Sequence, residues 1–175
     1  MVFARTWSEE LVAEWLSALG YAVLIGVPVG TSRGGGRKEA DVIGFRSEGT
    51  SVRVVHFEIS SIWGSSKEVI ERVRRKFSSE RVENVKQYIV GMTGSKNIVY
   101  EKHAIVFTSS GILEKAKKIL EKEEIKLWSF PEFFNTQVLP IVKEKVRMDR
   151  TFPDSLWLLN MLYTLCGEEL LHECS

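Results

Sequence analysis

The residues from 39 to 60 constrain the fold of this chain more than any other stretch of its sequence. Residues 40–46 and 52–60 are both rich in β-branched and aromatic side chains, and Ser47-Glu48-Gly49-Thr50 between them is a cluster of turn-forming residues. Two strand-like runs joined by so short a turn predict a β-hairpin. Because an isolated hairpin is only marginally stable, this one has to belong to a larger sheet with a core.

The acidic residues of this hairpin are predicted to share one face. An even number of loop residues makes the numbers of opposed residues sum to an odd value, for example Arg46 with Ser51 and Asp41 with His56. One face then carries Glu39, Asp41, His56, Glu58 and Ser60, and the other carries Val55, Phe57 and Ile59. Because neighbouring carboxylates repel one another unless a cation joins them, a divalent metal is the expected partner of the acidic face.

The rest of the chain alternates helices and strands. Thr6 and Glu9 are spaced as a capping box, and apolar residues at helical spacing follow until Gly20. The further elements expected in chain order are a strand over 21–29, the hairpin, a helix over 65–90 that Ser78-Ser79 can break, a strand over 102–109, a helix over 112–122, a strand over 124–130 and a helical turn from 131. This order predicts an α/β protein with a mixed central sheet flanked by helices.

The C-terminal part of the chain differs in character. Residues 156–165 are apolar almost all round, so a helix formed there has to be buried. We therefore expect a core domain over residues 1–135 and a C-terminal helical extension over 136–175 that packs on the core or on a partner. The partner would be a second copy of the chain in a homodimer, and packing across the open face of its own sheet is the alternative.

Composition and charge narrow the functional classes only slightly. The chain has 175 residues, which suits one domain with a proper core, and a formal net charge of +1 at pH 7. Global charge therefore does not indicate nucleic-acid binding, and only local basic patches can do so. The N-terminus lacks a signal-peptide pattern, and no stretch approaches about 18 continuous apolar residues. We expect a cytoplasmic protein with reduced thiols at Cys166 and Cys174 and with no membrane partner.

A basic, glycine-rich loop leads directly into the acidic hairpin. Residues 31–38 contain three consecutive glycines and the cations Arg33, Arg37 and Lys38. Such a loop suits contact with phosphate groups, and a solvated loop explains it equally well. The helix over 65–90 also carries an excess of positive charge, which fits either a nucleic-acid backbone or an ordinary solvated face with ion pairs.

The hairpin resembles the signature of the PD-(D/E)XK nucleases. The residues that carry the resemblance are Asp41 and, across the hairpin, Glu58-Ile59-Ser60. The order of elements over roughly residues 3–135 is similar to the restriction endonuclease-like core. The position of Glu9 resembles that of a glutamate in the first helix of archaeal Holliday-junction resolvases, and residues 104–128 are similar to the later strand, helix and strand of Mrr-type nucleases. The resemblance implies a restriction endonuclease-like fold.

The resemblance also implies roles for individual residues. Asp41 and Glu58, helped by the Ile59 carbonyl and by Glu9, would bind Mg²⁺ or Mn²⁺, whose bound water attacks the phosphodiester bond. The capping box alone accounts for Glu9 equally well. In the family a lysine stands two residues after the glutamate and helps to activate the water, and in this chain Ser60 holds that position.

A cation from elsewhere in the chain would have to replace that lysine. Lys67 is the first candidate because it opens the helix that follows the Glu58 strand, and Lys38 and Lys86 are the alternatives. His56, on the same face as the carboxylates, is either a general base or a hydrogen-bonded structural histidine.

Three functions are consistent with these observations. The first is a metal-dependent endonuclease that acts on DNA, which includes branched DNA. The second is a catalytically degenerate protein with the nuclease fold, which binds nucleic acid or a partner nuclease without cutting. The third is a structural or assembly subunit whose working surface is the apolar C-terminal helix. Metal binding with cleavage separates the first function from the other two.

Overall fold

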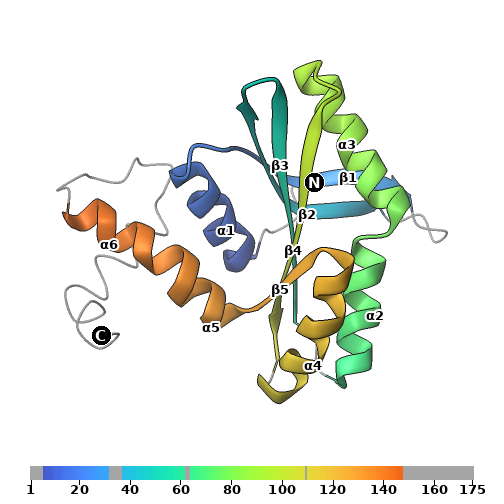
Figure 1. Cartoon of the computed structure of the whole chain (residues 1–175), viewed down its shortest axis with the longest axis vertical. Coiled ribbons are helices and arrows are strands. Elements are labelled where there is room, and N and C mark those ends of the chain that lie inside the picture. Colours follow the sequence, from blue (N-terminus) through green and yellow to red (C-terminus); the bar gives the residue numbers. More distant parts are fainter. Residues whose placement is uncertain (1–5, 32–36, 62–63, 109, 148–175) are drawn as a thin grey trace.

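The computed structural model describes residues 6–31, 37–61, 64–108 and 110–147, which form a sheet with helices on both of its faces (Figure 1). Within these residues the strands are β1 (Ala22–Thr31), β2 (Arg37–Glu48), β3 (Ser51–Ser61), β4 (Ile98–Phe107) and β5 (Ile125–Ser129). They lie in the order of their numbers; β1, β2 and β3 pair antiparallel, whereas β3, β4 and β5 pair parallel. The prediction of an α/β protein with a mixed sheet and flanking helices is confirmed.

The β2–β3 hairpin has a tighter turn than the sequence pattern predicts. Glu48 pairs with Ser51 across a two-residue turn, in which Gly49 adopts a φ of 60° that favours glycine. Arg46 therefore pairs with Arg53, and the predicted pairing of Arg46 with Ser51 is wrong. The error arose because polar residues that resemble a turn in sequence continue the strand instead.

The same shift changes the partner of Asp41. His56 pairs with Ile43, so the predicted pairing of Asp41 with His56 is also wrong. Because the register moves by two residues, however, every side chain keeps the face that the sequence predicts. The observed register, continued by one pair, brings Asp41 directly opposite Glu58 instead of diagonal to it.

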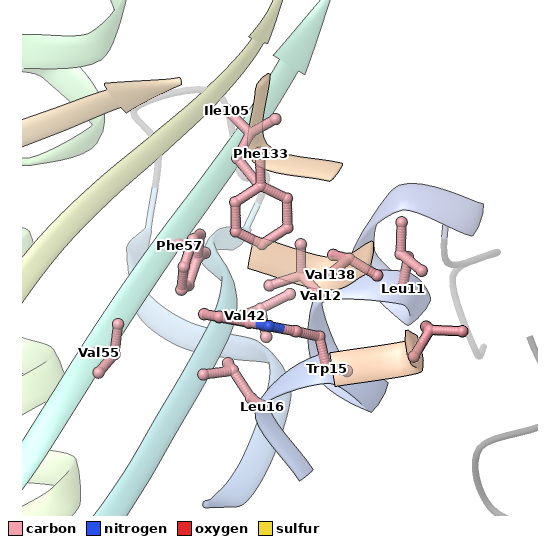
Figure 2. Packing of buried hydrophobic residues seen from close by; sticks show 12 residues of the cluster. Leu11, Val12, Trp15, Leu16, Val42, Val55, Phe57, Ile105, Phe133 and Val138 are labelled. Carbon is pink, nitrogen blue, oxygen red and sulfur yellow. The ribbon is translucent and has the colours of Figure 1, made fainter. Parts of the chain in front are cut away.

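Helices enclose apolar clusters on the two faces of the sheet. On one face lie α1 (Trp7–Ala18), α5 (Phe130–Phe133) and α6 (Leu139–Arg147), and on the other α2 (Ser66–Lys76), α3 (Ser79–Thr93) and α4 (Ser110–Leu120) (Figure 1). On the first face the Phe57 ring of β3 packs edge-on against Trp15 and Phe133, at centroid distances of 5.8 and 5.6 Å (Figure 2). The middle of strand β3 is covered on both faces, so the polar side chains of His56 and Glu58 are buried there.

A crossover of two helices joins β3 to its parallel neighbour β4. In the capping box of α2, the Ser65 hydroxyl accepts from the Glu68 N–H, and the Glu68 carboxylate accepts from the Ser65 N–H. Helix α2 ends at Lys76, and α3 begins at Ser79, so the break predicted within this helical segment is confirmed. It brings the end of α2 and the first turn of α3 close to β2 and β3.

Several element boundaries differ from the predicted ones, and two of these differences have a clear physical cause. Helix α3 continues to Thr93, past the predicted end at 90, and stops where Gly94 adopts a φ of 71°. Strand β4 begins at Ile98, four residues before the predicted start, because its pairing with β3 begins opposite Val52. Pairing across a sheet thus extends a strand beyond the run of apolar residues that marks it in the sequence.

A continuous helical stretch crosses the boundary expected at residue 135. Helix α5 is followed by a π-helical turn over Phe134–Val138 and then by α6. Val138 and Val142 are buried in the cluster with α1, so this part of the expected extension packs on the core. The apolar segment 156–165, with its predicted homodimer contact, lies outside the described residues. No helix among the described residues combines the length and apolar character that a membrane crossing requires.

Candidate functional site

Two carboxylates from adjacent strands meet on the face covered by α2 and α3. Asp41 comes from β2 and Glu58 from β3, and Oδ2 of Asp41 accepts a hydrogen bond of 2.7 Å from the backbone N–H of Ile59. The Glu58 side chain is only 2% exposed. The fold therefore brings together the two carboxylates that the sequence pattern places on one face, while the role of the Ile59 carbonyl as a metal ligand stays a prediction.

Two basic side chains from the helical crossover approach these carboxylates. Nζ of Lys76 lies 2.6 Å from Oε2 of Glu58 and 3.4 Å from each carboxylate oxygen of Asp41. Nη2 of Arg81 donates hydrogen bonds of 2.9 Å to Oε1 of Glu58 and 2.6 Å to the backbone carbonyl of Glu39. Lys76 is 32% exposed and reaches solvent, whereas Arg81 is 11% exposed and enclosed. The result is a cluster of two acidic and two basic groups.

Burial and mutual proximity set the protonation of this cluster. Burial, followed by the charge on Glu58, raises the pKa of Asp41 to about 7. Burial alone would raise the pKa of Glu58 too, but a hydrogen bond from His56 and the charge on Lys76 outweigh it and hold that pKa below its ordinary value. Burial alone would lower the pKa of Lys76, but Glu58 and Asp41 raise it above its ordinary value. Near neutral pH, Glu58 and Lys76 are therefore charged, and Asp41 titrates.

The raised pKa of Asp41 makes stability depend on pH within a defined window. The folded state keeps a proton on Asp41 up to about pH 7, whereas the unfolded chain releases it near the ordinary value of 3.8. This stabilisation is fully present below the lower value and is lost as the pH rises through the higher one. We expect the free energy of unfolding of the wild type, minus that of Asp41→Asn, to fall by about 2 to 3 kcal/mol between about pH 5 and pH 8.

Urea denaturation of both proteins in buffers containing EDTA measures this difference. Burial lowers the pKa of His56, and it lowers that of His103 to about 4. On acidification an unfolded histidine therefore gains a proton that the folded one does not, so these two histidines make the free energy of unfolding rise with pH, opposite to Asp41. Their contribution cancels when the variant is subtracted from the wild type. A difference that stays constant across the window contradicts the raised pKa of Asp41.

Three further residues predicted for the site lie apart from this cluster or at its edge. Ser60 is two positions beyond Glu58 on β3, on the same face, and is partly exposed. Lys67 lies in the first turn of α2, 85% exposed, with its Nζ 3.9 Å from Oε1 of Glu71. Glu9 lies in the first turn of α1, which packs on the other face of the sheet. Neither Lys67 nor Glu9 is among the partners of the two carboxylates in the part of the chain that the structure describes.

The residues predicted to contact phosphate are only partly described. Lys38 lies in β2 and is partly exposed. Arg37 is described through its backbone in β2, and Arg33 lies outside the described residues. Lys86, an alternative for the missing lysine, holds its Nζ 5.5 Å from the ring centroid of Tyr100.

Lys76 and Arg81 were not predicted from the sequence as members of the site, although helical periodicity contains a signal for both. Lys76 follows the buried Val69 by seven residues and the buried Val73 by three, so it lies on the core-facing stripe of α2. Arg81 precedes the buried Val85 by four residues and lies on the corresponding stripe of α3. A cation on a core-facing stripe needs a buried anion, and the acidic face of the hairpin supplies one.

The donor groups at this site are few. Within the described ranges, no group of three or more His, Cys, Asp or Glu side chains is arranged to hold a metal ion. Two surface hollows of about 290 and 480 Å³ border β5, and neither is lined by Asp41 or Glu58. A metal at the candidate site would therefore depend on two carboxylates together with water or substrate oxygens.

Comparison with known proteins gives no match, either to a protein-family model or to a curated protein.

Proposed function

We propose that this protein is a metal-dependent endonuclease of the PD-(D/E)XK class, which hydrolyses phosphodiester bonds in DNA. One observation carries the proposal: an aspartate, a glutamate and a lysine converge, with Nζ of Lys76 2.6 Å from Glu58 and 3.4 Å from Asp41. In this class such a trio forms the reactive centre. In the family a lysine at the strand position of Ser60 takes part in this centre. Here Lys76, from the end of α2, takes that role and replaces Lys67 as the candidate cation.

The arrangement of strands supports the restriction endonuclease-like fold as part of the same proposal. The antiparallel hairpin β2–β3 carries both carboxylates, and a helical crossover leads from it to the parallel strands β4 and β5. The two carboxylates stand at neighbouring positions of β2 and β3, where their spacing is fixed by the pairing of the strands.

The chemistry of the two carboxylates fits Mg²⁺ or Mn²⁺. Mg²⁺ is commonly bound in proteins through one or two carboxylates, several waters and the phosphate groups of a substrate. Oε2 of Glu58 is buried and is paired with Nζ of Lys76, whose side chain reaches solvent. Burial, followed by the charge on the neighbouring Glu58, raises the pKa of Asp41. A bound divalent ion would supply positive charge there and would lower the pKa of a coordinated water.

The protein residues then have separate tasks. Asp41 and Glu58 would hold the ion beside the junction of α2 and α3. The Lys76 ammonium is charged and reachable from solvent, so it donates hydrogen bonds to the attacking water or to a phosphate oxygen. Arg81 is enclosed and bonded to both Glu58 and the β2 backbone, so it fixes the carboxylate and leaves phosphate contact to Lys76.

One observation favours the alternative, a catalytically degenerate protein that binds nucleic acid or a partner nuclease without cutting. Glu58 already has Lys76, Arg81 and His56 as partners, so its charge is balanced within the protein. Such a balanced cluster is stable without a metal. The two proposals differ in whether added metal produces cleavage.

Cleavage assays on linear, branched and single-stranded DNA with Mg²⁺, Mn²⁺ or EDTA test the proposal. We expect metal-dependent cleavage by the wild type and a loss of about 100-fold in Lys76→Met, because a positive charge at the reacting phosphate is removed. Lys67→Met is the matched control, since it removes the same charge from an exposed position of the same helix. Folded wild-type protein that binds DNA and leaves every substrate uncut supports the degenerate alternative instead.

A further inference from the structure

The two oxygens of the Glu58 carboxylate have different partners. Oε1 accepts hydrogen bonds from Arg81 Nη2 and lies 2.9 Å from His56 Nε2. Oε2 is buried and forms an ion pair with Nζ of Lys76 at 2.6 Å. One oxygen is thus tied to the protein framework, and the other is turned toward Lys76 and Asp41.

His56 is held in place from its other side. The side chain is completely buried, with its Nδ1 2.6 Å from the hydroxyl oxygen of Tyr100 on β4. The Phe77 ring, which follows α2, packs edge-on against the imidazole at a centroid distance of 4.8 Å. Tyr100 and Phe77, together with Glu58, therefore fix the orientation of one imidazole ring.

The partners of His56 define its tautomer. An ionised carboxylate can only accept hydrogen bonds, so Nε2 of His56 carries a proton and donates a hydrogen bond to Oε1 of Glu58. In a neutral imidazole Nδ1 then has to accept, and the Tyr100 hydroxyl is the donor. The hydrogen bonds run in one direction, from Tyr100 through His56 to Glu58.

We infer that His56 is a positioning residue. Tyr100 sets it in the Nε2–H tautomer, and in that tautomer His56 holds Oε1 of Glu58 and thereby presents Oε2 to the metal. This inference rests on the proposed nuclease function and adds to it a chain of support behind one metal ligand. Residues that orient metal ligands from behind typically change metal affinity or activity by 10- to 100-fold when they are removed.

The affinity for Mn²⁺ in isothermal titration calorimetry tests this role without relying on cleavage. We expect His56→Phe to weaken Mn²⁺ binding about tenfold or more, since among the described residues Oε1 then keeps Arg81 alone as a donor. His56→Gln, whose amide can still donate to Glu58, should recover part of the affinity. Tyr100→Phe removes only the hydroxyl and should weaken binding less than His56→Phe, and it remains informative if His56→Phe does not fold.

His103→Phe is the matched control for His56→Phe. His103 is also a buried histidine, and it accepts a hydrogen bond from Trp128, but it points to the opposite face of the sheet, where it packs on Phe57. The variant makes the same chemical change in a similar environment, so we expect it to leave the Mn²⁺ affinity unchanged. An equal loss of affinity in both variants would show a general effect on stability and would overturn the inference.

A second readout uses the metal-free protein. The ¹⁵N chemical shifts of the His56 ring should report a neutral imidazole protonated at Nε2, and protonation at Nδ1 would overturn the assigned tautomer. Suppose that the wild type binds Mn²⁺ through Asp41 and Glu58 while folded His56→Phe and Tyr100→Phe bind it with unchanged affinity. That result overturns the positioning role and leaves the nuclease proposal intact. Wild-type protein that binds no Mn²⁺ overturns both, even where the ring is protonated as expected.

Discussion

Asp41→Asn is expected to reduce metal-dependent DNA cleavage by about 1,000-fold or more, and Glu58→Gln should have an effect of the same size. Each substitution removes one of the two carboxylates that the described part of the chain brings together at the site, and an amide oxygen is a poor substitute for a charged ligand of Mg²⁺. Asn at position 41 can still accept the hydrogen bond from the Ile59 N–H, so the hairpin should keep its geometry. Single-turnover cleavage at saturating metal measures the loss.

The stability of the same variant separates loss of chemistry from loss of fold. Because Asp41 is costly to ionise in its buried position, Asp41→Asn should be at least as stable as the wild type at pH 8 in the absence of metal. Glu39→Gln is the matched control, since it removes one negative charge two residues away on the same strand. Cleavage by Asp41→Asn at the wild-type rate would contradict the proposed function.

Arg81→Met should lower the free energy of unfolding by about 3 kcal/mol, the largest stability effect we expect of any single change at the site. Glu58 is almost fully enclosed, and Arg81 is the enclosed cation that donates to it. Removing this partner leaves a buried carboxylate with fewer donors, and the Glu39 carbonyl loses its hydrogen bond as well. Urea denaturation at pH 7 measures the change.

Arg74→Met is the matched control for this prediction. Arg74 lies on α2 and forms an exposed ion pair with Glu123, so solvent screens the interaction and its removal should change stability very little. Glu58→Gln in the Arg81→Met background should recover part of the lost stability, because the group left without a partner is then uncharged. Equal effects of Arg81→Met and Arg74→Met would mean that burial does not strengthen the pair with Glu58.

The faces of the hairpin could be predicted from the sequence, whereas its register could not. Side chains alternate with a period of two, so the position of Phe57 in the core places Glu58 on the other face of the sheet. A shift of the register by an even number of residues does not change which residues share that face. The register itself depends on where the turn begins. Ser47 and Glu48 resemble a turn in composition, yet they extend β2, and only the pairing with β3 reveals it.

The closeness of Lys76 to the two carboxylates was missed for a geometrical reason. Lys67 is nearest to Glu58 in sequence, but a helix advances about 1.5 Å per residue, so nine residues carry the chain about 14 Å along α2 to Lys76. Helix α2 starts away from the carboxylates and runs back toward them. Sequence distance therefore favoured Lys67, at the start of the helix, whereas the rotation of Lys76 onto the core-facing stripe was the better guide to the neighbours of the two carboxylates.

The helical origin of the cation also bears on the order in which the molecule folds. The hairpin joins residues that are close along the chain, whereas Lys76 contacts Asp41 across 35 residues and Arg81 contacts Glu58 across 23. Local contacts close first because they lose less chain entropy, so the hairpin can form while its carboxylates are still hydrated. Docking of the crossover then removes that water and supplies the cations in a single step. The nascent sheet is thereby spared a period in which two buried anions lack partners.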